Sequence, residues 1–268
     1  GLAVKTDQGE VAFARESATA DWVLTDAALP FKARKTKVDG ILNALAMWKS
    51  GDIVGKDRPD LFGLDAPAAV VTLKLGEQER RYEIGSQVPG TDSSRFIRVS
   101  GVDQVLVLPD YKYTQINVSP IDAVEATLID NAPDSVRRIE LHDGAAPVVL
   151  TRGDDAAWSW QQGDESGPAN RAKAQQVAHA VTRVTPVAWW QKLTAAEAGL
   201  ESPPRRAVVT WKEGESEATA ELTFGTRYGP GEVDQYLALA GVPAVLGCTA
   251  SLAERVFVPL ADLQQADA

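Results

Sequence analysis

Apolar and polar residues alternate along several segments of the chain, which is the pattern of half-buried strands. Val71, Leu73 and Leu75 are separated by polar neighbours, and residues 217–224 alternate between polar and apolar positions without interruption. Strands with one apolar and one polar face are typical of antiparallel sheets. Further apolar segments follow glycine-containing turns such as Gly76–Glu77. The pattern therefore predicts hairpins in both halves of the chain.

In two other segments the apolar residues recur every three or four positions, which is the period of an α-helix. The first apolar stripe consists of Val38, Ile41, Leu42 and Leu45. We expect this helix to be capped by Thr36 and to end at Ser50–Gly51. The second stripe consists of Ala174, Val177, Val181 and Val184, after an expected Asn170 cap. Each helix is predicted to pack one face on a sheet.

The chain also matches itself at an offset close to 140 residues. Matching pairs include Trp22 with Trp160, the segment 63–67 with 199–203, and Gly85 with Gly225. Self-similarity at a fixed period is the mark of a repeated structural unit. We therefore predict an α+β fold of two tandem repeats, residues 1–132 and 133–268. Each repeat is expected to be a mostly antiparallel sheet with one main amphipathic helix.

Composition and charge exclude several classes of function. The formal net charge is −10, because 37 acidic residues outnumber 27 basic ones. An acidic surface repels phosphate backbones, so we expect no nucleic-acid partner. No apolar run approaches the roughly 18 residues of a membrane span. The only methionine is Met47, so we expect that residue 1 is not a translational start.

A search for catalytic chemistry predicts no catalytic, metal or cofactor site. The two histidines, His142 and His179, are far apart, and neither has the close partners that a metal site needs. His179 is expected on the solvent face of its helix, and Cys248 is expected to be a buried, inert thiol. No nucleophile elbow, phosphate loop or dinucleotide fingerprint is present. The sequence therefore predicts a protein that is not an enzyme and has no cofactor.

Two segments at equivalent places in the repeats are the candidate ligand or partner loops. They span residues 86–94 and 226–234, longer than most hairpin loops. The candidate contact residues are Pro89, Asp92, Arg95, Arg227, Tyr228 and Asp234. A long hairpin tip without function is the alternative. Adjacent Trp189 and Trp190 must face opposite sides of a strand, and we expect burial between the repeats, with a sugar-stacking platform as the alternative.

The motif order resembles a known bacterial family. It is carried by Phe62–Pro67, of sequence Phe-Gly-Leu-Asp-Ala-Pro, by Tyr82–Gly85 and by Phe96–Gly101. These residues resemble domain-of-unknown-function family 4340, most clearly over residues 20–130. The second half departs from the pattern, with Glu201 and Ser202 in the corresponding motif.

The resemblance implies an extracytoplasmic protein, periplasmic or on the cell surface, tethered by an N-terminal membrane segment. It also implies partners among ABC-type transport components, and it brings no catalytic residues. The expected function is a non-catalytic accessory or binding module of a bacterial transport or envelope system. Two alternatives stay open at this point. One is an envelope protein that binds, or hydrolyses, glycans or peptides, and the other is a structural spacer.

Overall fold

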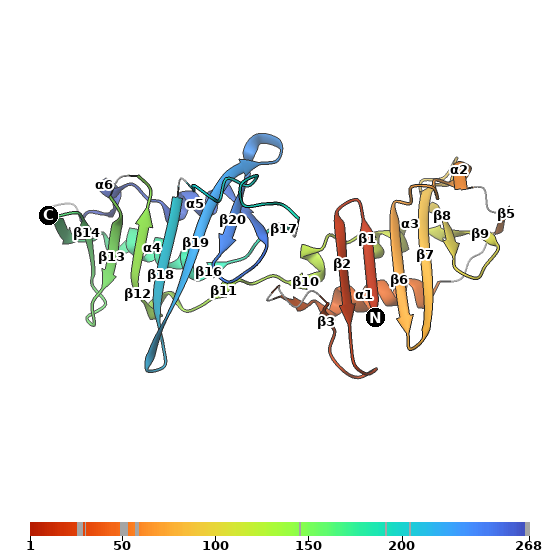
Figure 1. The fold of residues 1–268 in the computed structure, drawn as a ribbon, viewed down its shortest axis with the longest axis horizontal. Helices are drawn as coiled ribbons and strands as arrows, with labels where there is room; N and C mark the ends of the chain where they lie inside the picture. The colour runs from red at the N-terminus through yellow and green to blue at the C-terminus, as the bar shows by residue number, and fades with distance from the viewer. Residues whose placement is uncertain are drawn as a thin grey trace. The chain divides into compact units, whose positions relative to one another are not determined.

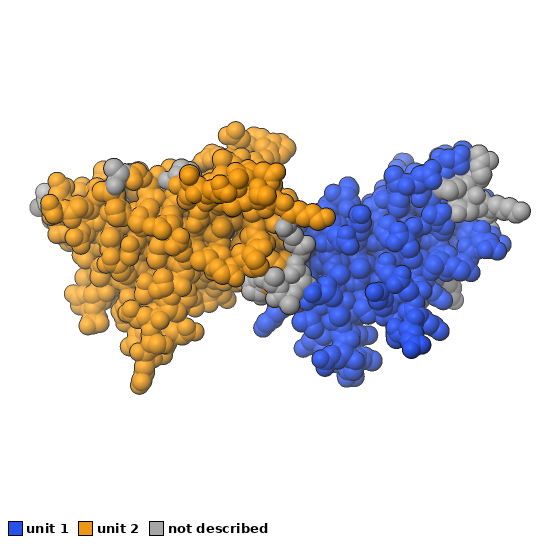
Figure 2. All heavy atoms as spheres, in the orientation of Figure 1, with its two compact units in different colours: residues 1–27, 31–125 blue, residues 28–30, 126–268 orange. Residues whose placement is uncertain are grey.

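The computed structural model describes residues 1–25, 29, 31–48, 53–56, 59–144, 146–190, 192–203 and 205–265. The chain forms two compact units (Figure 2). Unit 1 comprises residues 1–27 and 31–125, and unit 2 comprises residues 28–30 and 126–268. The boundary expected from the sequence, between residues 132 and 133, lies shortly after this division.

Unit 1 is built on one antiparallel sheet. Its strands are β1 (Leu2–Thr6), β2 (Gly9–Ala14), β3 (Val23–Leu24), β4 (Lys32–Ala33), β5 (Ile53–Lys56), β6 (Ala69–Leu75), β7 (Gln78–Gln87), β8 (Ser94–Val99), β9 (Gln104–Pro109) and β10 (Val124–Glu125). Their order in space is β10-β4-β3-β2-β1-β6-β7-β8-β9-β5. The helices are α1 (Lys35–Ala46), α2 (Pro59–Phe62), α3 (Asp110–Ile116) and the 3-10 turn η1 (Ile121–Ala123).

The core of unit 1 lies between the sheet and α1 (Figure 1). Val4 pairs with Val71 across β1 and β6, and both side chains are fully buried. Val38 and Ile41 of α1 are also fully buried. The residues next to Val4 on β1 and next to Val71 on β6 point to the opposite face of the sheet, as the two-residue period of a strand requires. One face of the sheet is therefore left for other contacts.

Unit 2 has a second antiparallel sheet. Its strands are β12 (Val136–His142), β13 (Val148–Arg152), β14 (Trp158–Gln162), β15 (Glu165–Pro168), β17 (Ala188–Trp190), β18 (Arg205–Glu213), β19 (Ser216–Tyr228), β20 (Asp234–Leu239) and β21 (Val245–Thr249). Their order in space is β15-β14-β13-β12-β18-β19-β20-β21-β17. The short strands β11 (Ile129–Asp130) and β16 (Arg183–Val184) pair separately. The helices are α4 (Arg171–Thr182), α5 (Ala250–Val256) and α6 (Leu260–Leu263), with 3-10 turns η2 (Pro133–Ser135) and η3 (Pro230–Glu232).

The two long helices differ in how they begin. The Asn170 side chain accepts hydrogen bonds from the amides of Ala172 and Lys173, so the predicted cap of α4 is confirmed. The predicted cap of α1 is wrong. That helix begins one residue before Thr36, because the Arg34 amide donates to the carbonyl of Ala123 and leads β4 directly into the helix. Arg34 stands at the cap position and makes no side-chain cap hydrogen bond.

The end expected for α1 is also displaced. The helix ends at Ala46, and the amide of Met47 donates to the carbonyl of Asn43. Ser50 and Gly51, the expected end, lie outside the described residues. Both units are mostly antiparallel sheet with few helices, so the predicted α+β class is confirmed.

Candidate functional site

Two glycines of unit 1 let the Phe62–Leu64 segment approach strand β7 closely. A Cβ added at Gly85 would lie only 2.1 Å from the carbonyl oxygen of Phe62 and 3.1 Å from Leu64 Cδ2. Gly63 has φ +67°, a conformation that residues with a side chain rarely adopt. The register between β7 and β8 also shifts between Ile84 and Gln87, which leaves a bulge at this point. We call this contact the clamp of unit 1.

An apolar cluster holds the clamp of unit 1 in place. Leu64 packs with Phe96 and Val105, and all three side chains are buried. Phe62 adds its ring at 4.6 Å from the ring of Phe96. The clamp therefore covers the outer face of the sheet over β8 and β9, on the side opposite α1.

Unit 2 contains a corresponding contact, the clamp of unit 2. A Cβ added at Gly225 would lie 2.1 Å from the carbonyl oxygen of Ala198 and 3.2 Å from Leu200 Cδ2. The amide of Thr226 donates to that same carbonyl at 2.9 Å. Gly199 has φ +68°. The Gly-Leu motifs singled out in the sequence thus fix the path of the chain over a sheet.

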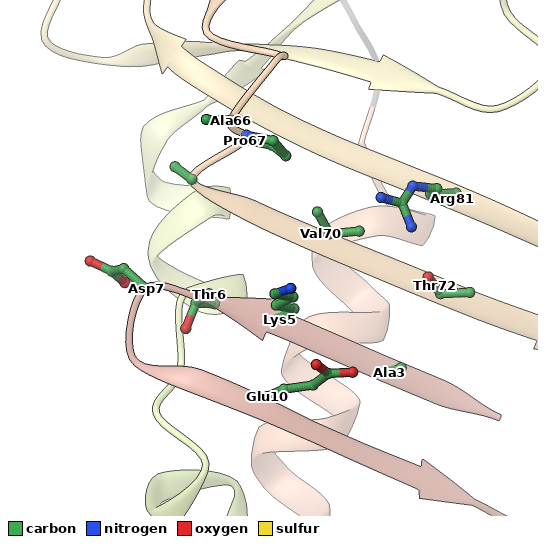
Figure 3. Close-up of a pocket in the computed structure, with 11 residues that line it drawn as sticks. Ala3, Lys5, Thr6, Asp7, Glu10, Ala66, Pro67, Val70, Thr72 and Arg81 are labelled. Atoms are coloured by element: carbon green, nitrogen blue, oxygen red, sulfur yellow. The ribbon is translucent and has the colours of Figure 1, made fainter. Parts of the chain in front are cut away.

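The segment after the clamp of unit 1 forms one wall of an open groove (Figure 3). The groove has a volume of about 710 Å³ and lies on the outer face of β2, β1, β6 and β7. Its wall is Ala66–Ala68, and its floor consists of the small side chains of Ala3, Val70 and Thr72. None of the residues that line it is aromatic. Sequence reasoning missed this groove, because its wall and floor are far apart along the chain.

Charged groups of both signs stand around the groove. Asp7 and Glu10 lie on the β1–β2 side, and Arg81 lies on β7 with its guanidinium directed over the groove (Figure 3). Lys5 stands between them and is directly opposite Glu10 in the strand register. The groove therefore carries opposite charges at its two ends, and Lys5 stands beside the apolar Val70 in its middle.

Arg81 is held in place by an ion-pair network on β7 and β8. Its Nε donates to Glu83 Oε1 at 2.9 Å, and Arg98 Nε donates to Glu83 Oε2 at 2.6 Å. Burial by itself would raise the pKa of Glu83, but the hydrogen bonds from the two arginines outweigh it and lower the pKa. The guanidinium groups of Arg81 and Arg98 therefore share the carboxylate of Glu83.

The first predicted loop is shorter than expected. Strand β7 continues to Gln87 and β8 begins at Ser94, so only residues 88–93 remain outside the strands. The bulge after Ile84 allows β7 to continue where the sequence pattern predicts a loop. Pro89 and Asp92 are both exposed in the remaining loop.

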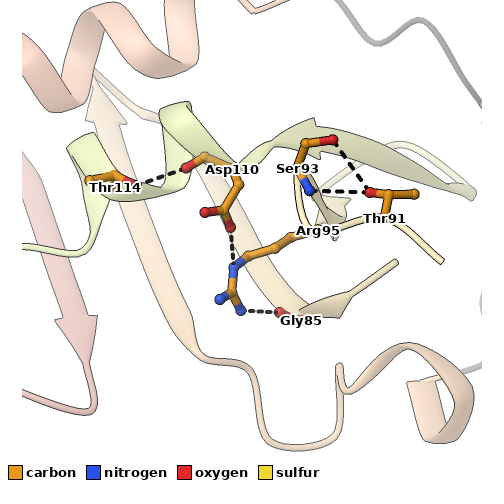
Figure 4. A network of polar contacts seen from close by, with 6 residues as sticks. All are labelled: Gly85, Thr91, Ser93, Arg95, Asp110 and Thr114. Carbon is orange, nitrogen blue, oxygen red and sulfur yellow. Dashed lines mark hydrogen bonds and ion pairs between the residues drawn. The ribbon is translucent and has the colours of Figure 1, made fainter. Parts of the chain in front are cut away.

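Arg95 does not lie in that loop, and its guanidinium is bound within unit 1 (Figure 4). Its Nε donates to Asp110 Oδ1 at 2.9 Å, and Nη1 lies 3.5 Å from the carbonyl oxygen of Gly85. The guanidinium also lies 3.9 Å above the ring of Tyr113. At the matching register position of unit 2, Gln235 Nε2 donates to the carbonyl oxygen of Gly225 at 2.8 Å. Both side chains satisfy the carbonyl of the glycine in the clamp.

The second predicted loop is also partly strand, because β19 continues to Tyr228 and β20 begins at Asp234. Arg227 forms an exposed ion pair with Glu254, at 3.1 Å. The ring of Tyr228 stacks on Tyr236 with 4.4 Å between centroids. Tyr228 and Asp234 are directly opposite in the strand register, whereas Arg95, Pro89 and Asp92 belong to the other unit. A ligand or partner role for these six residues stays a prediction.

Tyr228 belongs to an aromatic cluster inside unit 2. Trp190 meets Tyr228 and Tyr236 edge-on, with centroids 5.1 and 5.2 Å apart. The hydroxyl of Tyr228 is buried, and no described residue bonds to it. Burial, followed by the nearby charge of Asp234, raises the pKa of Tyr228. This tyrosine therefore stays protonated and acts as part of the packing.

The other titratable residues singled out in the sequence are placed as expected. Cys248 is fully buried, and burial raises the pKa of its thiol to about 12. His179 is exposed on α4. His142 is half-buried beside Arg206, with 3.3 Å between nitrogens. Within the described residues, no group of three or more histidine, cysteine or acidic side chains could hold a metal ion.

No helix in the described part of the chain is long and apolar enough to cross a membrane. A family model described as "Domain of unknown function (DUF4340)" matches residues 22–203, which is more than half of the chain. The matched span begins at Trp22 and ends at Pro203, the last residue of the second Gly-Leu motif. No curated protein and no solved structure matches the chain.

Proposed function

The chain belongs to domain-of-unknown-function family 4340, and from this membership we propose a non-catalytic accessory module that binds a partner. The partner is a component of a bacterial ABC-type transport or envelope system. The module acts outside the cytoplasm and is tethered to the membrane by an N-terminal segment. The observation that carries the binding role is the open groove of unit 1, with charges of both signs at its ends and a floor of small side chains.

An open groove on a sheet suits binding better than catalysis. Enzyme sites are concave pockets that enclose most of a small substrate and converge several reactive groups on it. Here the acidic groups and Arg81 stand apart, Lys5 stands between them, and the floor is formed by Ala3, Val70 and Thr72. Such a surface offers contact area and a few positioned charges, which is what a protein partner requires.

We further propose that the two units are tandem copies of one ancestral unit. The sheets support this, because β1-β6-β7-β8-β9 of unit 1 and β12-β18-β19-β20-β21 of unit 2 follow the same order. The clamps support it too, since a Cβ added at Gly85 and a Cβ added at Gly225 would each lie 2.1 Å from a carbonyl oxygen. A long helix, α1 or α4, occupies the same place in each chain order.

The test of the accessory role is a crosslinked pull-down of the full-length protein from its native membrane, followed by mass spectrometry. We expect ABC-type permease or ATPase subunits among the crosslinked proteins. Recovery without any transport subunit above background would overturn the accessory role. Cell fractionation tests the location independently, and full-length protein in the cytosolic fraction would contradict an extracytoplasmic module.

A further inference from the structure

The groove of unit 1 has negatively charged side chains at one end and a positively charged side chain at the other. We propose that it binds an extended peptide segment of the partner, with one basic and one acidic side chain about four residues apart. The basic side chain faces Asp7 and Glu10, and the acidic side chain faces Arg81. This proposal rests on the proposed function, because it names the part of the partner that the module recognises.

The charges at the two ends of the groove remain available to an occupant. No described residue forms an ion pair with Asp7 or Glu10, and both are exposed. Lys5 is opposite Glu10 and offsets its charge, so Asp7 gives this end its negative sign. Arg81 uses Nε for Glu83, and its terminal nitrogens point over the groove (Figure 3). A guanidinium positioned in this way is suited to a carboxylate.

The register of the strands sets the distance between the two ends. Ala3 pairs with Thr72, and Thr72 pairs with Arg81, so Arg81 is level with Ala3 and two strands away. Asp7 is four residues further along the chain from Ala3. With about 4.8 Å between strands and about 3.3 Å per residue, the backbones at Asp7 and Arg81 are about 16 Å apart.

An extended peptide fits this distance when its two charged side chains are four residues apart. Charged side chains that point to the same face must be an even number of residues apart. Four residues span about 13 Å, and the reach of the side chains covers the remainder. The residue midway between them also points at the floor. It must be small, because the wall at Ala66–Ala68 and the floor at Val70 leave a shallow channel.

The first experiment titrates uniformly ¹⁵N-labelled protein with the blocked peptide Lys-Thr-Ala-Thr-Glu (KTATE). Its charged ends are four residues apart, and alanine stands at the midpoint. The control peptides KTATK and ETATE carry one sign of charge only. We expect amide shifts at Ala3, Val70 and Thr72, and a Kd at least tenfold lower for KTATE than for either control. Equal affinity for all three peptides, or shifts confined to other strands, would overturn the proposal.

Two charge reversals test the polarity directly. The Arg81→Glu variant should bind KTATK more tightly than KTATE, because the end that faced the acidic residue is now acidic. The Asp7→Lys variant should bind ETATE more tightly than KTATE for the corresponding reason. Arg80→Glu is the matched control, since Arg80 is exposed on the same strand and does not line the groove. Circular dichroism checks that each variant is folded. If Arg81→Glu perturbs the sheet, Asp7→Lys in the β1–β2 turn still decides the question. Unchanged preference in a folded variant counts against the proposal.

The same variants in the pull-down separate this proposal from the proposed function. We expect the wild type and Arg80→Glu to recover transport subunits, and Arg81→Glu and Asp7→Lys to lose them. If the reversals still recover these subunits, the groove is not the docking site, although the accessory role stands. If the wild type recovers none, the accessory role fails, and the titration alone judges the groove. Self-association in sedimentation velocity that Arg81→Glu abolishes would make a second copy the occupant and overturn the proposal.

Discussion

At the scale of single residues, a carbonyl oxygen decides which side chain is tolerated at positions 85 and 225. A Cβ added at Gly85 would lie 2.1 Å from the carbonyl oxygen of Phe62, which is too close for a contact. A Cβ added at Gly225 would lie equally close to the carbonyl oxygen of Ala198. Backbone atoms cannot move aside as a flexible side chain can. The clamp must open before any larger residue fits.

We expect Gly85→Ala to lower the free energy of unfolding of unit 1 by roughly 2–3 kcal/mol, as overpacking of a dense site does. Gly40→Ala is the control. Gly40 lies inside α1 with no atom within 4 Å of an added Cβ, so alanine should stabilise by about 0.5–1 kcal/mol. Urea unfolding with amide hydrogen exchange of β7 measures both. A loss below 0.5 kcal/mol for Gly85→Ala, on the order of a surface substitution, would show that the clamp yields easily.

Arg95 gives a second prediction at this scale. Arg95→Ala leaves the Gly85 carbonyl and the Asp110 carboxylate without this donor, and should cost roughly 1–3 kcal/mol. Arg95→Gln should recover part of that loss, since Gln235 serves the corresponding carbonyl in unit 2. Urea midpoints of the two variants decide the matter. Equal midpoints for alanine and glutamine would mean that the contact with the carbonyl contributes nothing.

Residue environments could be predicted where they depend on local pattern. The exposure of His179 and the burial of Cys248 followed from their positions in a helix and a strand, and both are confirmed. The setting of Arg95 could not be predicted. Its partners come from the first residue of α3, Asp110, and from the Gly85 carbonyl on β7, where the register shifts at a bulge.

At the scale of elements, the two long helices differ in their first turn. The side chain of Asn170 accepts two amide hydrogen bonds at the start of α4, whereas the side chain of Arg34 accepts none at the start of α1. We expect Asn170→Ala to destabilise unit 2 by about 1 kcal/mol. Arg34→Asp should stabilise unit 1 by a similar amount, because an aspartate side chain can accept from amides of the first turn and its charge favours a helix N-terminus. Thermal unfolding checks both, and the same sign of change in both variants would contradict the prediction.

The network on β7 and β8 makes part of the stability depend on pH. Folding lowers the pKa of Glu83, so its contribution is fully present above about pH 4.5. It is lost as the pH falls through the lowered pKa of the folded state. We expect Glu83→Gln to be less stable than the wild type at pH 7 and equal to it near pH 2. Urea midpoints at the two pH values measure this, and a gap that persists at the lower pH would argue against the ion pairs as its cause.

Element type was predictable and element ends were not. Alternation along β6 and β19 predicts strands because each strand has one buried face, which is a local property. The lengths of the loops at 86–94 and 226–234 were overestimated, since the bulges at the clamps let the strands continue. Such a bulge depends on a contact with a segment that is distant in the sequence. The alternation of apolar and polar residues within the strand does not reveal that contact.

At the scale of the whole molecule, each unit has its own sheet and its own clamp. Cys248, the only cysteine in the chain, lies in unit 2 and is fully buried. A thiol reagent reaches it only when the structure around it opens, because the buried thiol is also held protonated. Its labelling rate therefore reports the opening of one unit.

We expect Gly225→Ala to accelerate labelling of Cys248 about 30-fold, which corresponds to about 2 kcal/mol of lost stability. Gly85→Ala should leave the rate unchanged, since its clamp lies in unit 1. The measurement is the rate of reaction with a chromogenic disulfide in native buffer. Equal acceleration by both substitutions would show that the units open together.

The clamp of unit 1 has a consequence for recognition. The chain passes from the clamp at Leu64 straight into Ala66–Ala68, the wall of the groove. A partner that contacts the wall binds only when the clamp is closed. The affinity for the partner therefore depends on the equilibrium between the closed and the open clamp. An occupant would then slow the opening of the Phe62–Leu64 segment from a distance. Conversely, a substitution that loosens the clamp would weaken recognition without altering any atom that touches the partner.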